Sequence, residues 1–156
     1  MEREDYAYFD TRRCFVELDE ITGIVIEESI RIHKELGPGL LESVYEAVLA
    51  RALTRRGLRV ERQKTFTFEY DGMLFEEGLR IDLLVESCVV VELKSVEKLA
   101  PVHAKQTLTY IRLMKLQVGL LINFGGETLK EGLKRIVNNL SPPQSSVLRV
   151  NRGEKS

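Results

Sequence analysis

With 156 residues, 44% of them hydrophobic, the chain is long enough for one well-formed core, and we expect a single domain over residues 1–156. Its 23 Lys and Arg and 24 Asp and Glu give a net charge of -1, which does not indicate nucleic-acid or membrane binding, so either would need a local patch. Two cysteines, Cys14 and Cys88, argue against a disulfide framework, and the charged start of the chain lacks an apolar segment. We therefore expect a cytoplasmic protein with no membrane span.

The first third of the chain has helical patterns. We expect a polar leader over residues 1–17, followed by an amphipathic helix over residues 19–36 that the Gly-Pro-Gly sequence at 37–39 ends. A second helix is expected over residues 40–56, with Gly57 ending it. The predicted core-facing residues of the two helices are Ile21, Val25, Ile32 and Leu36, and Leu41, Val44, Val48 and Leu49.

Strand patterns follow. Residues 65–70 and 73–77 predict a hairpin around Asp71-Gly72, and Gly78 predicts a bulge or bend before a strand at 79–85. Further expected elements are a strand ending at Glu92-Leu93-Lys94, a helix over 101–115, a buried strand over 118–124, a helix over 128–140 and a tail over 141–156. This order predicts an α/β fold with helices on both sides of the sheet, its core over about residues 19–140.

Charged residues interrupt the two central strands. Asp82 stands in an apolar run, and Glu92 and Lys94 follow three valines, two residues apart, so their side chains emerge on one face. Burying such charges costs several kcal/mol per ion, on the order given for buried ion pairs, unless they pair or serve a ligand. We predict a register that sets Asp82 opposite Glu92 across a three-residue turn at 86–88. The alternative is a cross-strand ion pair of Lys94 with either acid.

Several motifs together resemble a known family. Gly39, Glu42 and Tyr45 match the defining motif of the G-x-x-E-x-x-Y proteins, and Asp82 with Glu92-x-Lys94 resembles the motif of the PD-(D/E)XK nuclease superfamily. The resemblance runs from about residue 21 to 137 and includes His103, Gln106, Tyr110 and the strand end at 123–125. Ile81 stands before Asp82 where the motif name has proline. The resemblance implies a restriction-endonuclease-like core with a mixed central sheet.

The resemblance also implies a chemistry. Asp82, Glu92, the Leu93 main-chain carbonyl and Glu42 would hold Mg²⁺, with Mn²⁺ as a substitute, and Lys94 would stabilise charge at the phosphate. These acids and Lys94 are the expected catalytic residues. Helix capping is the alternative for Glu42, because an acid in a first helical turn complements the helix dipole.

Substrate-binding roles are implied for Gln106, Tyr110 and Tyr45. Gln106 and Tyr110 are one helical turn apart and share a face, whereas the alternatives are ordinary helix polarity for this pair and packing for Tyr45. A histidine such as His103 or His33 is more often a capping or surface group than a catalyst.

Basic residues gather in two segments. A solvated surface is their ordinary meaning, but beside an acidic pocket they would contact a phosphate backbone. They are Arg51, Arg55, Arg56, Arg59, Arg62 and Lys64, then Lys98, Lys105, Arg112 and Lys115.

We therefore expect a Mg²⁺-dependent nuclease that cleaves phosphodiester bonds, with DNA as the nucleic-acid partner; the sequence does not indicate whether it forms a homo-oligomer. One alternative is a catalytically inactive nucleic-acid- or protein-binding module that keeps the nuclease fold. Another is a regulatory subunit that uses the helix near residues 99–116 as a contact surface.

Overall fold

The computed structural model describes residues 11–139 and holds one five-stranded sheet. Its elements are α1 (Thr11–Leu36), α2 (Glu42–Arg55), β1 (Val60–Tyr70), β2 (Met73–Val85), β3 (Val89–Lys94), α3 (Pro101–Leu113), β4 (Val118–Asn123), the 3₁₀ helix η1 (Lys130–Gly132) and β5 (Leu133–Val137). The strand order is β1-β2-β3-β4-β5. Strands β3 and β4 are parallel, joined by α3 as crossover, and the other neighbours are antiparallel. The predicted α/β fold with a mixed, helix-flanked sheet is confirmed.

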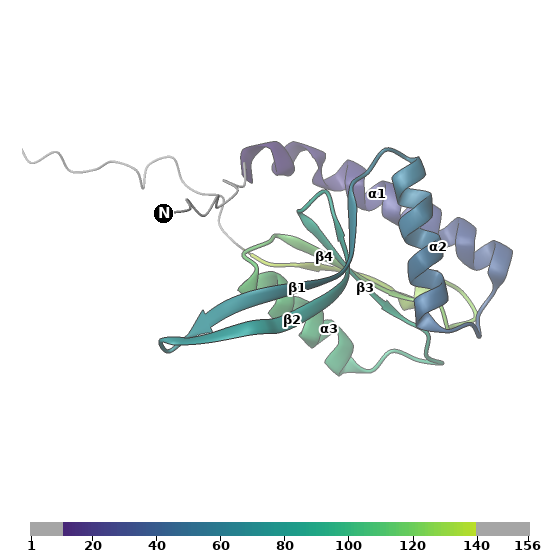
Figure 1. Ribbon diagram of the computed structural model, residues 1–156. Coiled ribbons are helices and arrows are strands. Elements are labelled where there is room, and N and C mark those ends of the chain that lie inside the picture. Colours follow the sequence, from purple (N-terminus) through teal and green to yellow (C-terminus); the bar gives the residue numbers. More distant parts are fainter. Residues whose placement is uncertain (1–10, 140–156) are drawn as a thin grey trace, which may run out of the picture.

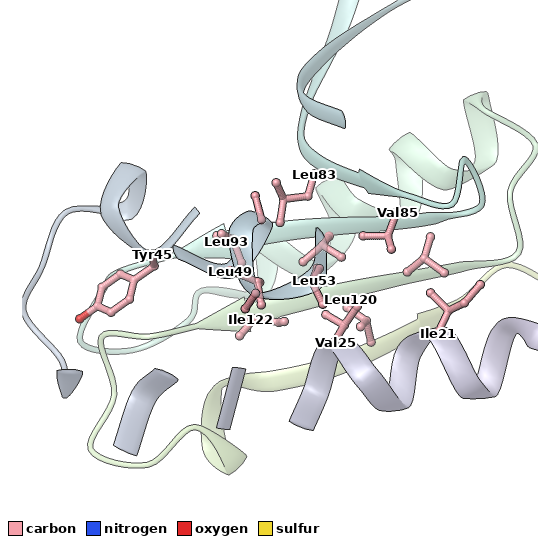
Figure 2. Packing of buried hydrophobic residues seen from close by; sticks show 14 of the residues in the cluster. Ile21, Val25, Tyr45, Leu49, Leu53, Leu83, Val85, Leu93, Leu120 and Ile122 are labelled. Atoms are coloured by element: carbon pink, nitrogen blue, oxygen red, sulfur yellow. The ribbon is translucent and has the colours of Figure 1, made fainter. Parts of the chain in front are cut away.

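Two hydrophobic clusters hold the layers together. In the larger one, α1 and α2 pack against one face of β2, β3 and β4, as Figure 1 shows for the elements and Figure 2 for the side chains. In the smaller one, Ile111 of α3 packs with Ile81, Leu84 and Val90 on the other face. Alternate residues of β3 therefore contribute to different clusters, as the two-residue period of a strand requires.

The β1–β2 hairpin extends beyond the rest of the sheet (Figure 1). Its turn lies at Asp71-Gly72, as predicted, and both residues have positive φ. The pairing shifts between Phe66 and Phe68, where β2 carries the extra residues that include Gly78. A Cβ at Gly78 would overlap the ring of Phe68, so only glycine fits there. The predicted bulge at Gly78 is confirmed, and β2 continues through it.

The structure corrects the prediction for the first two helices. Helix α1 begins at Thr11, so residues 11–17 are helical rather than part of a leader; residues 1–10 and the predicted tail at 141–156 lie outside the described residues. No Gly or Pro interrupts residues 11–18, which is why the helix can begin earlier. The buried face of α2 carries Tyr45, Leu49 and Leu53, whereas Leu41 is 74% exposed.

The prediction of a final helix at residues 128–140 is wrong. The segment forms η1 and then β5, which pairs antiparallel with β4 from Leu133 to Val137. Gly132 disfavours a helix, and a Cβ there would lie only 2.7 Å from the Asn123 carbonyl oxygen. Because β4 is buried along its whole length, β5 satisfies main-chain groups that would otherwise be unpaired.

Candidate active site

The β2–β3 hairpin brings the two central acids together. Leu83 pairs with Val91 and the turn spans residues 86–88, which is the predicted register. Beyond this pair the regular ladder ends, and the next position along each strand holds Asp82 and Glu92. Strand β2 leaves β3 here to continue as the hairpin with β1.

Side-chain hydrogen bonds replace the ladder at this fork. The Asp82 amide donates to Glu92 Oε1 at 3.3 Å, and the Leu93 amide donates to Asp82 Oδ2 at 2.8 Å. Each carboxylate therefore accepts a main-chain hydrogen bond from the opposite strand. This exchange fixes the two side chains at the point where the strands separate.

Burial and repulsion act on the same carboxyl group. Glu92 is only 7% exposed. Burial, followed by the negative charge of Asp82, raises the pKa of Glu92 to about 8, although the Asp82 amide and the charge of Lys94 act in the opposite direction. Without a bound cation, the pair therefore favours a protonated Glu92 at neutral pH.

Lys94 lies two residues after Glu92, on the face of β3 that also carries Val90 and looks toward α3. Its side chain is half-buried. Within residues 17–139, Lys94 forms no ion pair with Asp82 or Glu92, so the alternative of a cross-strand salt bridge is not realised. Its charge acts on Glu92, but the ammonium forms no salt bridge with either acid and can still approach another anion.

Glu42 opens α2 at the same end of the sheet. The Ser95 hydroxyl, one residue after Lys94, donates to the Leu40 carbonyl at 2.6 Å and so ties the start of α2 to the end of β3. Glu42 itself is exposed. Among the described residues its carboxylate has no hydrogen bond or salt bridge, and no group of three or more His, Cys, Asp or Glu side chains is suited to hold a metal ion. Its part in the metal site stays a prediction.

The acid of α2 that the structure connects to Asp82 is Glu46. Its carboxylate, 6% exposed, accepts hydrogen bonds from Arg62 Nε at 3.0 Å and from Gln63 Nε2 at 2.6 Å. Gln63 Nε2 also donates to Asp82 Oδ1 at 3.3 Å. Sequence reasoning missed both residues. Glu46 could have been found from the sequence, because it is next to Tyr45 in the buried stripe of α2 that continues with Leu49 and Leu53. Gln63 lies in a polar run whose pattern does not indicate a functional residue.

Tyr45 lies inside the protein. Its side chain is fully buried, its hydroxyl donates to the Gly37 carbonyl at 2.5 Å and accepts from the Leu40 amide at 3.2 Å, and its ring stacks on Phe124 at 4.5 Å. Tyr45 therefore packs in the core, which was the alternative to a substrate-binding role. The side chain closes the loop that leads into α2 and thereby fixes where Glu42 begins the helix.

Gln106 and Tyr110 lie on α3, across the other face of the sheet. Gln106 Nε2 donates to the Tyr110 hydroxyl at 2.7 Å, so the two form one exposed polar unit. His103 Nδ1 accepts a hydrogen bond from the Ala100 amide at 3.1 Å and caps the helix start, and His33 Nε2 lies 3.0 Å from the Gly126 carbonyl. His103 is thus a helix-capping residue, as one of the alternatives from the sequence expected.

The two basic segments differ in their surroundings. In the first, the side chains of four residues pair with acids of the same protein: Arg56, Arg59, Arg62 and Lys64. In the second, the residues are exposed and form no salt bridge among residues 17–139: Lys98, Lys105, Arg112 and Lys115. These four lie on or beside α3, on the side of the sheet that Glu92 and Lys94 face.

The loop after Lys94 is held by a buried amide. Asn123, 2% exposed, accepts the Val96 amide at its Oδ1, 3.0 Å away, and donates Nδ2 to the Val96 carbonyl at 2.8 Å. Gly125 packs so closely on Val96 that a Cβ at residue 125 would overlap the Val96 main chain. These contacts, with the Phe124 amide bonded to the Lys94 carbonyl at 2.8 Å, fix the end of β3.

A comparison with protein-family models identifies the family to which the chain belongs. The model described as PD-(D/E)XK nuclease superfamily matches residues 19–136, which is most of the chain and includes every candidate site residue named above. The chain therefore belongs to the PD-(D/E)XK nuclease superfamily, whose members generally use divalent metals, and this membership supports a nuclease-type function. Neither the curated proteins nor the solved structures gave a significant match. No helix within residues 11–139 is long and apolar enough to cross a membrane.

Proposed function

We propose that this member of the PD-(D/E)XK nuclease superfamily is a divalent-metal-dependent nuclease that hydrolyses phosphodiester bonds of DNA. The observation that carries the proposal is the pair of carboxylates at the fork of β2 and β3, with Lys94 unpaired beside it on the same face as Glu92. The Gly39-to-Tyr45 motif supports a narrower assignment to the G-x-x-E-x-x-Y proteins.

The donor set at the fork suits a hard divalent cation. Carboxylate and carbonyl oxygens are the ligands that Mg²⁺ and Mn²⁺ take, and Asp82, Glu92 and the Leu93 main-chain carbonyl would supply them. Burial, and after it the negative charge of Asp82, raises the pKa of Glu92, and a cation bound between the two carboxylates would oppose both effects. Glu42, exposed at the end of the sheet where β3 ends, would complete the set directly or through water. When bound, such an ion supplies charge stabilisation at the phosphate and lowers the pKa of water.

The chain's own residues would orient the substrate. Lys94, held at the end of β3 by the contacts of its main chain, would place a positive charge against the scissile phosphate. The exposed Gln106–Tyr110 unit would contact a neighbouring phosphate, and Lys98 and Lys105 would bind the backbone on the same side. Tyr45, which is buried in the core, would contribute indirectly by fixing the start of α2.

Two variants, Lys94→Ala and Asp82→Ala, distinguish charge stabilisation at the phosphate from metal binding. Lys94→Ala should keep its fold and bind Mn²⁺, yet cleave generic single- or double-stranded DNA roughly a hundredfold more slowly, the scale for loss of one preorganised charge donor. Asp82→Ala should lose metal affinity as well. The measurements are metal titration calorimetry and a gel-based cleavage assay on the same preparations, with Lys134→Ala, an exposed lysine on β5, as the control. Equal cleavage by wild type and Lys94→Ala contradicts the mechanism.

One observation favours a second function, a binding module that keeps the nuclease fold without activity. No three candidate metal-binding side chains gather within the described residues, so the site rests on two carboxylates unless Glu42 moves toward them. A wild-type protein that binds Mn²⁺ but cleaves neither DNA nor RNA makes this module the better account. RNA tested beside DNA also decides between the two substrates.

A further inference from the structure

Gln63 has an unusual backbone for a residue inside a strand. Its φ is 49°, in the left-handed region, although it is not a glycine and lies midway along β1. The ladder pairs the residues on either side of it with β2 but omits Gln63, which stands opposite Asp82. Such a conformation costs on the order of 1 kcal/mol or more and persists only where the surroundings hold it.

Two carboxylates hold the Gln63 side chain. Its amide nitrogen carries two hydrogens, and it donates to Glu46 Oε2 at 2.6 Å and to Asp82 Oδ1 at 3.3 Å. The Glu46 carboxylate is itself fixed, because it is buried on α2 and its other oxygen accepts from Arg62. Gln63 therefore bridges a rigid acid of the helix layer to an acid of the strand fork.

The bridge completes the restraint on Asp82. The Leu93 amide binds Oδ2 and the Gln63 amide binds Oδ1, so a donor approaches each oxygen and sets the plane of the carboxylate. Each oxygen retains a further lone pair for another ligand. Metal-binding carboxylates are commonly held in this way by outer hydrogen bonds.

We propose that Gln63 is a positioning residue for Asp82 and that Glu46 is its anchor, acting on Asp82 only through Gln63. This inference rests on the proposed function, in which Asp82 binds the metal. It also gives a reason why the strained backbone persists, because hydrogen bonds to both acids hold the Gln63 side chain in place.

The test compares Gln63→Gly with Thr65→Gly. Glycine adopts positive φ without strain, so Gln63→Gly is compatible with the backbone of β1 while it removes the bridging amide. Thr65→Gly makes the same substitution two residues along the strand, at an exposed position. Titration calorimetry with Mn²⁺ should show roughly 10- to 100-fold weaker binding for Gln63→Gly, the range for loss of an outer hydrogen bond to a ligand, and unchanged binding for Thr65→Gly. Circular dichroism checks that both variants are folded.

Glu46→Gln tests the anchor. It should also weaken Mn²⁺ binding, but the double variant Glu46→Gln/Gln63→Gly should bind no more weakly than Gln63→Gly alone, because both act through one contact. In a cleavage assay, Gln63→Gly should lower kcat and raise the Mn²⁺ concentration for half-maximal rate, with KM for DNA unchanged. A general loss of structure would not change kcat and the Mn²⁺ requirement while it left the KM for DNA unchanged.

The outcomes separate this inference from the proposed function. Any of three results overturns the positioning role. These are wild-type affinity for Mn²⁺ in Gln63→Gly, a loss of Mn²⁺ affinity in Thr65→Gly as large as that in Gln63→Gly, and additive weakening of Mn²⁺ binding by the two substitutions in the double variant. A wild-type protein that binds Mn²⁺ and cleaves nothing contradicts the proposed function, and the calorimetric comparison then still decides the role of Gln63.

Discussion

Replacing Glu92 by Gln should stabilise the metal-free protein at neutral pH. In the folded state the pKa of Glu92 is about 8, raised mainly by burial and then by Asp82, whereas an unperturbed glutamate has a value of 4.5. The folded protein therefore holds a proton that the unfolded chain has lost between these two values. Its free energy of unfolding must fall as the pH rises through this window and then level off above pH 8.

The magnitude follows from the size of the shift. Each pKa unit corresponds to about 1.4 kcal/mol, so raising the pH from the unfolded value to 7 removes roughly 3 kcal/mol of stability from the wild type. Glu92→Gln has no such proton, and its amide oxygen can still accept the bond from the Asp82 amide. We expect the variant to exceed the wild type by roughly 1 to 3 kcal/mol at pH 7 and to differ little well below pH 4.5, where the wild-type side chain is protonated in both states.

Urea denaturation in EDTA at several pH values measures this difference. Glu97→Gln, an exposed acid three residues beyond Lys94, is the control and should follow the wild type. In buffer without EDTA, added Mn²⁺ should stabilise the wild type but not Glu92→Gln, because binding to the folded state alone raises its stability. A Glu92→Gln variant less stable than the wild type at pH 7, or a difference independent of pH, refutes the reasoning.

Two further predictions concern the framework of the site. Burial raises the pKa of Glu28, but hydrogen bonds from Arg31 and Arg56 outweigh it and the net shift is downward, so Glu28→Gln should lose on the order of 1 kcal/mol at pH 7. That loss should shrink as the pH falls through the folded pKa, which thermal melts over a series of pH values from 7 downward will show, with Glu20→Gln, an exposed acid of α1, as the control. A pH-independent loss contradicts it. Asn123→Ala should lose roughly 1 to 3 kcal/mol in urea denaturation, because it leaves the partly buried main-chain groups of Val96 unpaired, and a loss below about 0.5 kcal/mol contradicts this.

Features encoded by neighbouring residues could be predicted from the sequence. The Asp71-Gly72 turn, the bulge at Gly78 and the end of α2 before Gly57 all depend on local backbone preferences. The register of β2 and β3 was also predictable, since the short turn at residues 86–88 sets it and a shift by one residue would put Asp82 and Glu92 on opposite faces.

Features that depend on distant parts of the chain were not predictable. Residues 133–137 form a strand because β4 needs a partner, a requirement absent from the segment's own pattern. The face of α2 was misplaced because Leu41 and Val44 are apolar yet exposed, while a buried acid, Glu46, is satisfied by residues of β1. The same long-range pairing hid Gln63, whose importance depends on what lies opposite it.

The most direct test of the account is a crystal structure of the protein soaked with Mn²⁺. The anomalous map should place one peak between the Asp82 and Glu92 carboxylates, beside the Leu93 carbonyl, with the Lys94 ammonium outside the ligand set. A protein that binds Mn²⁺ in solution, yet shows its peak elsewhere or leaves the fork of β2 and β3 without one, contradicts the metal site on which the proposed nuclease activity depends.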